Sequence, residues 1–171
     1  MARVYLGLGS NIQPEHYLGA GLDALHALFG ELALSSVYEG AAIGFEGRPF
    51  LNLVARIETA MPIEVLAATL RELEVAHGRR PDATRFESRR LDIDILTYDQ
   101  CVGCYGPVTL PRDEISHNAF VLRPLAELAP EERHPVLGQT YRALWEAYDK
   151  ASQQVFPVAF RWRGRVISRA G

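Results

Sequence analysis

Two aspartates separated by a single residue, Asp92 and Asp94, lie in an alternating segment that predicts a strand over residues 91–98. Side chains two positions apart in a strand project from the same face, so the two carboxylates stand together, opposite a face of leucine and isoleucine. Mg²⁺ prefers carboxylate oxygens and completes its shell with water and substrate phosphates. The pair therefore indicates a platform for Mg²⁺, although a solvated strand face accounts equally well for two aspartates taken alone.

An arginine-rich segment leads directly into this aspartate pair. Residues 79–90 carry a local charge of +3 and hold five arginines: Arg79, Arg80, Arg85, Arg89 and Arg90. Arginine forks match pairs of phosphate oxygens, and phosphoryl transfer depends on positioning and on neutralising charge around phosphorus. The segment therefore favours a phosphate-handling enzyme. An RNA-binding patch is the alternative, but it predicts interleaved aromatic residues, and Phe86 is the only aromatic residue in the segment.

Other nucleotide, redox and metal motifs are incomplete. The single lysine, Lys150, does not belong to a phosphate loop, which needs a Gly-Lys-Ser/Thr ending. The glycines of residues 7–9 lack the third glycine of a dinucleotide fingerprint, because position 12 is isoleucine. Cys101 and Cys104 form one C-x-x-C pair, whereas a structural zinc site needs four ligands, so we interpret them as ordinary loop cysteines.

Length and composition predict one globular domain. The chain has 171 residues, of which 48% are hydrophobic and 23% charged, with a net charge of −3. These values argue against disorder and a disulfide scaffold, and no apolar run approaches the roughly 20 residues that span a bilayer. The first residues lack the pattern of a signal peptide. We therefore expect a cytoplasmic protein, monomeric or homodimeric, with neither nucleic acid nor membrane as a partner.

The predicted elements alternate along the chain. Strands are expected over residues 4–9, 32–38, 50–59, 91–98, 108–110 and 155–167, and helices over 14–28, 62–77, 118–128 and 140–153. The β-α-β-β-α-β order predicts an α+β protein: a ferredoxin-like α/β sandwich with a mainly antiparallel sheet flanked by helices. Residues 158–163 are expected to form an extra C-terminal strand at a sheet edge or against a partner, with Phe160 and Trp162 facing inward.

Four blocks, in order and at matching separations, resemble the 6-hydroxymethyl-7,8-dihydropterin pyrophosphokinase family. They are Tyr-Leu-Gly-Leu-Gly-Ser-Asn at 5–11, Phe-Leu-Asn-Leu-Val at 50–54, the run over 74–95 and the run over 111–130. Each block alone is weak, but the four together are specific. The resemblance implies a pterin pyrophosphokinase domain over 1–154 with an extension over 155–171. It also implies Mg²⁺-dependent transfer of pyrophosphate from ATP to a pterin alcohol, in folate or related pterin synthesis.

The same resemblance implies roles for individual residues. Asp92 and Asp94 match the ligands of two Mg²⁺ ions, and Arg79 and Arg89 match catalytic, phosphate-binding arginines. Residues matched to ATP binding further include Glu74, Thr109 and Arg112. Residues matched to the pterin are Gly40, Ala41 and Ile43 through their backbone, Phe50 and Phe120 as a ring sandwich, and Asn52 on the hydrogen-bonding edge.

The sequence also differs from the family pattern, mainly around the nucleotide. Residues 39–42 replace the usual Thr-Pro-Pro, Arg112 replaces a histidine, and Asn118 stands near a usual arginine. Pro81 and Phe86 replace a basic residue and a tryptophan. Two further interpretations therefore stay open: a paralogue that binds pterin or nucleotide without turnover, and a ferredoxin-like regulatory or RNA-binding module. The last would not need the aspartate pair together with an amide at position 52.

Overall fold

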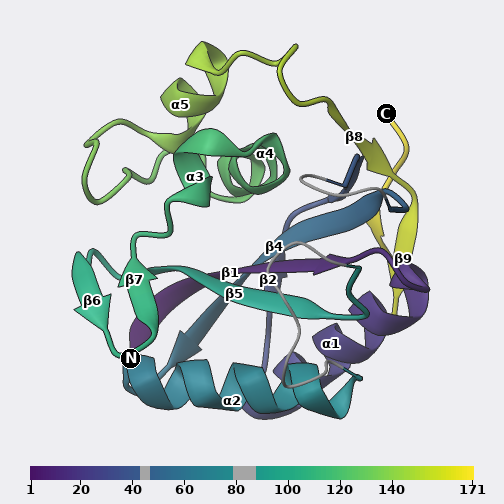
Figure 1. Cartoon of the computed structure of the whole chain (residues 1–171), viewed down its shortest axis with the longest axis horizontal. Coiled ribbons are helices and arrows are strands. Elements are labelled where there is room, and N and C mark those ends of the chain that lie inside the picture. Colours follow the sequence, from purple (N-terminus) through teal and green to yellow (C-terminus); the bar gives the residue numbers. More distant parts are fainter. Residues whose placement is uncertain (43–46, 79–87) are drawn as a thin grey trace.

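The structure is a computed structural model that describes residues 1–42, 47–78 and 88–171. Its strands are β1 (Ala2–Ser10), β2 (Ala33–Leu34), β3 (Val37–Gly40), β4 (Phe50–Thr59), β5 (Asp92–Tyr98), β6 (Gly103–Tyr105), β7 (Val108–Leu110), β8 (Val155–Val158), β9 (Phe160–Trp162) and β10 (Arg165–Ser168). Its helices are α1 (Pro14–Phe29), α2 (Ile63–Ala76), α3 (Glu114–His117), α4 (Ala119–Leu128) and α5 (Tyr141–Ala147). Figure 1 shows their arrangement.

The main sheet confirms the predicted fold class. Its strand order is β5-β1-β4-β3-β8, β2 pairs with β4, and neighbouring strands run antiparallel. Each of the two β-α-β connections skips one strand, so β1 and β4 lie at the centre, between β5 and β3. This is the ferredoxin-like arrangement, and it sets the aspartates of β5 against the glycines of β1.

Helices cover both faces of the sheet, with α1 and α2 on one side and α3, α4 and α5 on the other (Figure 1). Under α1 and α2, leucines at helical spacing pack on the sheet; Leu18, Leu22 and Leu66 are fully buried. The opposite face is buried too, since Val54 of β4 and Leu96 of β5 belong to a second core with the helices above them. The core therefore lies on both faces of the sheet, under α1 and α2 and under the helices opposite them.

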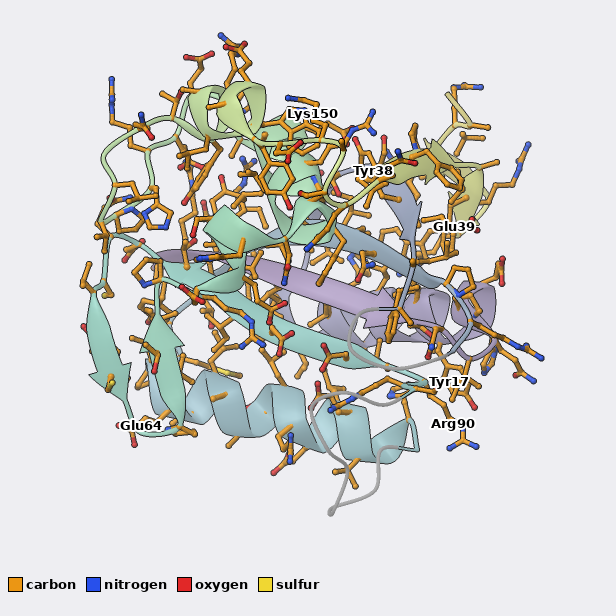
Figure 2. The ribbon with its side chains drawn as sticks, turned by 45° about the horizontal axis from the view of Figure 1, so that its top comes forward. Tyr17, Tyr38, Glu39, Glu64, Arg90 and Lys150 are labelled. Atoms are coloured by element: carbon orange, nitrogen blue, oxygen red, sulfur yellow. The ribbon has the colours of Figure 1, made fainter. Side chains whose placement is uncertain are left out.

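Two predicted elements are shorter than expected. The strand expected over residues 32–38 is divided into β2 and β3, because the Ser35 hydroxyl accepts a hydrogen bond from Val54 N and interrupts the ladder. The helix expected over residues 140–153 ends at Ala147, where Tyr148 turns extended. Lys150, beside this helix in Figure 2, donates to the carbonyl oxygens of Trp145 and Glu146 at the helix end.

The C-terminal segment adds an edge strand, but over different residues from those predicted. The strand that extends the sheet is β8, which pairs with β3, whereas β9 pairs with β10 in a separate two-stranded sheet. Phe160 is buried, and the Trp162 indole donates to Asp23 of α1 at 2.9 Å. Both aromatic side chains therefore face inward, as predicted. Among the described residues, every helix is too short or too polar to cross a bilayer.

Candidate active site

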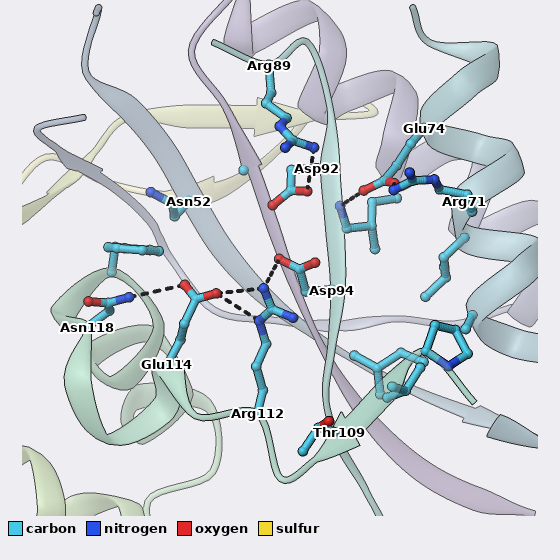
Figure 3. Close-up of a pocket in the computed structure, with 18 of the residues that line it drawn as sticks. Asn52, Arg71, Glu74, Arg89, Asp92, Asp94, Thr109, Arg112, Glu114 and Asn118 are labelled. Atoms are coloured by element: carbon cyan, nitrogen blue, oxygen red, sulfur yellow. Dashed lines mark hydrogen bonds and ion pairs between the residues drawn. The ribbon is translucent and has the colours of Figure 1, made fainter. Parts of the chain in front are cut away.

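A cavity of about 840 Å³ lies beside β5, between α2, β7 and the start of α4 (Figure 3). Its lining includes ten of the residues predicted for the site: Ala41, Phe50, Asn52, Glu74, Arg89, Asp92, Asp94, Thr109, Arg112 and Phe120. Gly40 lies just outside, where it pairs with Phe50 and Val155. Arg79 and Ile43 lie outside the described residues.

Asp92 and Asp94 project from β5 into this cavity, and their side chains are 31% and 27% exposed. Burial raises the pKa of Asp94 well above its ordinary value, the Asp92 carboxylate raises it further, and Arg112 opposes both effects. Two close carboxylates that resist ionising together fit a divalent cation, which would relieve their repulsion. The described residues form no cluster of three or more metal-ligating side chains, so water or a ligand would complete the coordination shell of Mg²⁺.

Arg89 is held at the end of β1 by the Ser-Asn turn. Its guanidinium is 7% exposed and lies 3.7 Å from Asp92 Oδ1. Its backbone N–H donates to Asn11 Oδ1 at 2.8 Å, and its carbonyl accepts from Asn11 N at 3.0 Å. Asn11 also donates to the Arg48 carbonyl and to the Ser88 hydroxyl. The turn that ends the first sequence block thus fixes an arginine 78 residues away beside the aspartate pair.

Arg112 lies on the other side of the aspartate pair, between two carboxylates. Its Nη2 is 3.6 Å from Asp94 Oδ2 but only 2.6 Å from Glu114 Oε1, which also accepts from Nε at 2.9 Å. The second oxygen of Glu114 accepts from the Asn118 amide at 3.1 Å. The guanidinium is therefore held mainly by Glu114, beside Asp94 rather than clamped on it.

Glu74 anchors α2 to β5 between the two aspartates. Its side chain is 4% exposed, and Oε2 accepts from the backbone N–H of Ile93 at 2.8 Å. Its other oxygen lies 3.6 Å from the Arg71 guanidinium, one helical turn earlier. A buried carboxylate needs such partners, and here a backbone N–H and a guanidinium supply them. Glu74 therefore contributes to the spacing between α2 and the strand as well as to the cavity wall.

The far wall of the cavity carries an amide and two aromatic side chains. Asn52 of β4 is 8% exposed and lines the cavity together with Phe50 and Phe120. Gly9 of β1 lies opposite Asn52 in the register, and a Cβ atom there would come within 2.6 Å of Asn52 Oδ1. Glycine at this position therefore leaves the amide room to stand beside the strand.

The family model for 7,8-dihydro-6-hydroxymethylpterin-pyrophosphokinase (HPPK) matches residues 5–130, most of the chain. The chain belongs to the HPPK family. It is 37% identical over 138 residues to the 2-amino-4-hydroxy-6-hydroxymethyldihydropteridine pyrophosphokinase of Pseudomonas aeruginosa, covering 78% of this chain and 84% of that protein. It is also 36% identical over 155 residues to the folic acid synthesis protein fol1 of Schizosaccharomyces pombe, covering 88% of this chain.

Similarity to solved structures supports the HPPK fold over nearly the whole chain. The wild-type HPPK-DHPS of Plasmodium falciparum, solved with pteroate, superposes with a TM-score of 0.71 at 13% identity, over 98% of this chain and 49% of that one. The chain spans about half of that protein and 20% of the length of fol1, so both relatives carry further sequence.

Several residues around this cavity were not predicted from the sequence. Glu114 has no recognisable spacing to the aspartates, and its role depends on a contact across the cavity rim. Arg71 could have been found, because it stands three residues before Glu74 on the same helix face. Asn118 was noted only as a difference from the family pattern, and Gly9 only as part of a block. The roles assigned to the predicted residues stay predictions.

Proposed function

We propose that the protein is an Mg²⁺-dependent pyrophosphokinase that transfers pyrophosphate from ATP to 6-hydroxymethyl-7,8-dihydropterin in folate synthesis. The observation that supports this most is a single cavity with two chemically different walls. One wall carries the aspartate pair with Arg89 and Arg112, and the other carries Asn52 with two phenylalanines. The first suits a triphosphate with its cations, and the second suits a flat heterocycle with a polar edge. Membership of the HPPK family adds independent support.

In the proposed reaction the pterin hydroxymethyl oxygen attacks the β-phosphorus of ATP, and its hydroxyl proton passes to water. The bond from that phosphorus to the α,β-bridging oxygen breaks, and AMP leaves. Asp92 and Asp94 would hold two Mg²⁺ ions, which when bound neutralise the phosphate charge. Arg89 and Arg112 would donate to phosphate oxygens, and no side-chain nucleophile is required, because the chemistry depends on positioning and electrostatics.

In the same proposal, the residues that bind the pterin and those that bind the nucleotide lie on different walls of the cavity. Phe50 and Phe120 would stack on the two faces of the pterin ring, while the Asn52 amide offers donors and an acceptor to its edge. Thr109 of β7 and Glu74 of α2 would border the nucleotide. Arg79 would add a further phosphate contact, and Ala41 and Ile43 would contribute backbone groups to the pterin.

The experiment that tests this function follows AMP during incubation with ATP, Mg²⁺ and the pterin alcohol. AMP and pterin diphosphate in equal amounts are expected. Binding of both substrates without AMP would favour the non-catalytic paralogue, and no binding of either would favour a regulatory or RNA-binding module.

Variants of the aspartate pair test the metal assignment. Asp92→Asn and Asp94→Asn should each abolish Mg²⁺-dependent turnover with the fold intact, because a carboxamide lacks the anionic oxygen that Mg²⁺ needs. The matched control is Asp99→Asn just after β5, where the side chain accepts from Arg3 N and lies outside the cavity lining. Near-normal activity in either cavity variant would overturn the assignment.

A further inference from the structure

We propose that Glu114, Asn118 and Gln153 are positioning residues for Arg112, and that they join the C-terminal part of the chain to the metal-binding face of the cavity. The inference rests on the proposed function, since it concerns how that site binds its nucleotide. Gln153 lies before β8 and lines no part of the cavity itself. It acts on Arg112 only through the two residues between them.

The chain of contacts is continuous. Arg112 donates to Glu114 Oε1 through Nε and Nη2 at 2.9 and 2.6 Å. The Asn118 amide donates to Glu114 Oε2 at 3.1 Å, and Gln153 Nε2 donates to Asn118 Oδ1 at 2.9 Å. The other end of the Gln153 amide, Oε1, accepts from the backbone N–H of Ala119 at 3.0 Å, at the start of α4. Figure 3 shows the part from Asn118 to Asp94.

The direction of every hydrogen bond in this chain is fixed from both ends. An ionised carboxylate only accepts, so Asn118 must turn its NH₂ group to Glu114 and its oxygen to Gln153. A backbone N–H only donates, so Gln153 must turn its oxygen to Ala119 and its NH₂ group to Asn118. The two requirements agree, and neither amide can flip without losing a bond. Such a chain holds its members in one arrangement.

The consequence for the site is the position of the guanidinium. Without Glu114, Arg112 would close on Asp94, the next carboxylate within reach, and would occupy an oxygen that a cation needs. With Glu114 holding two of its N–H groups, the guanidinium stays 3.6 Å from Asp94 Oδ2. Its remaining N–H groups can then serve a phosphate. Asn118 and Gln153 keep the Glu114 carboxylate from turning away.

The test measures equilibrium binding of α,β-methylene-ATP with Mg²⁺ by calorimetry, and pterin binding and AMP formation alongside it. Glu114→Gln is expected to weaken binding of the Mg²⁺ analogue about tenfold, because the charge-assisted hydrogen bonds that hold Arg112 in place for a phosphate are weakened. Gln153→Glu should weaken it about three- to tenfold, because it keeps an acceptor for Ala119 N but cannot donate to Asn118. Pterin binding should be unchanged in both. Ser152→Ala, which removes an exposed hydrogen bond next to Gln153, is the matched control and should bind like the wild type.

The double variant separates positioning from general destabilisation. With glutamine at 114 and glutamate at 153, every hydrogen bond from Arg112 to residue 153 can form again with Asn118 reversed. Gln153→Glu should therefore cost little further binding in the Glu114→Gln background, a non-additivity that two independent structural losses would not give.

Three results would overturn the proposal. They are a Gln153→Glu variant that binds the analogue like the Ser152→Ala control, an equal loss of pterin binding, and additive effects in the double variant. Because the binding measurement needs no turnover, these results are distinct from failure of the proposed function, which wild-type protein would show by making no AMP.

Discussion

At the scale of single residues, the cavity wall that carries Asn52 depends on the absence of a side chain at Gly9. A Cβ atom on Gly9 would lie only 2.6 Å from Asn52 Oδ1, which is too close for the amide to keep its position. Gly9→Ala should therefore displace the amide and weaken pterin binding by about 1–3 kcal/mol, the cost of a buried polar group that loses its partner. Binding of Mg²⁺ and nucleotide should change little. Titration calorimetry with each ligand measures both.

Gly19→Ala is the matched control for that variant. Gly19 lies in α1 with open space around its Cβ position, so alanine there should leave pterin binding intact and stabilise the helix. A pterin affinity that is unchanged in Gly9→Ala would mean that Asn52 can move at no cost, or that its amide does not read the ligand.

Residue spacing alone predicts site residues whose partners are close in sequence, but it does not predict those whose partners are distant. The aspartate pair follows from two-residue spacing on a strand, and both side chains do face the cavity. Phe50, Asn52 and Phe120 followed from the resemblance to a family and line the same cavity. Gln153 meets Asn118 across 35 residues, through contacts that exist only once α4 and the C-terminal segment have packed. No local pattern carries that information.

At the scale of elements, the turn after β1 connects the sheet to the arginine segment. Asn11 is 2% exposed, and its side chain forms hydrogen bonds with the backbone at Arg48 and Arg89. Asn11→Ala should lower the free energy of unfolding by about 1–3 kcal/mol and weaken nucleotide binding, because Arg89 loses its support. Asn11→Asp keeps the acceptor for Arg89 N, so it should retain more nucleotide affinity than alanine does. Equal losses in both variants, measured by denaturation and calorimetry, would contradict this.

The turn before α5 should respond to acid through His134. Burial lowers the pKa of His134 below its ordinary 6.5, and its ring Nδ1 accepts from the backbone N–H groups of Val136 and Leu137. Below pH 6.5 the unfolded chain therefore binds more protons than the folded one, and the free energy of unfolding falls as the pH falls from 6.5 toward the lowered pKa.

His134→Asn isolates this effect. Asparagine offers an acceptor to the same two N–H groups but does not titrate, so the loss of stability on acidification should be smaller in the variant. Denaturant titrations from about pH 7.5 to about pH 5 measure the difference. Parallel stability curves for the two proteins would show that His134 does not carry the dependence.

Elements were predictable where pattern and packing agree. The strand over residues 50–59 and the helix ending at Leu128 were predicted with the observed bounds or within one residue. The helix expected over residues 140–153 was too long, because the apolar spacing continues to Tyr148 while the lysine that follows binds the last carbonyls. The second face of β4 is partly buried because α4 packs over Val54, in a third layer that no strand pattern shows.

At the scale of the whole molecule, residues 155–171 complete the sheet and stay away from the cavity lining. β8 pairs with β3 along four residues, Phe160 is 5% exposed in the main core, and the Ser168 hydroxyl accepts from Val37 N at 2.9 Å. Without this segment β3 would become an open edge, and the apolar surface under Phe160 would face water. We propose that this extension contributes stability and that residues 1–154 carry the reaction.

Two truncations that differ by two residues test this division. Ending the chain after Gln154 should lower the melting temperature and the solubility, since an edge strand and a buried aromatic are lost, yet the soluble fraction should still bind Mg²⁺ with α,β-methylene-ATP. Ending it after Ser152 removes Gln153 as well, so nucleotide binding should fall further, while the melting temperature changes little between the two forms. Scanning calorimetry and titration calorimetry on both forms measure the two quantities.

If the form ending at Gln154 is as stable as the full chain, the extension is dispensable. If it is folded but binds no nucleotide, β8 supports the site through α4, because Val155 O accepts from Arg123 of that helix and the contact is lost.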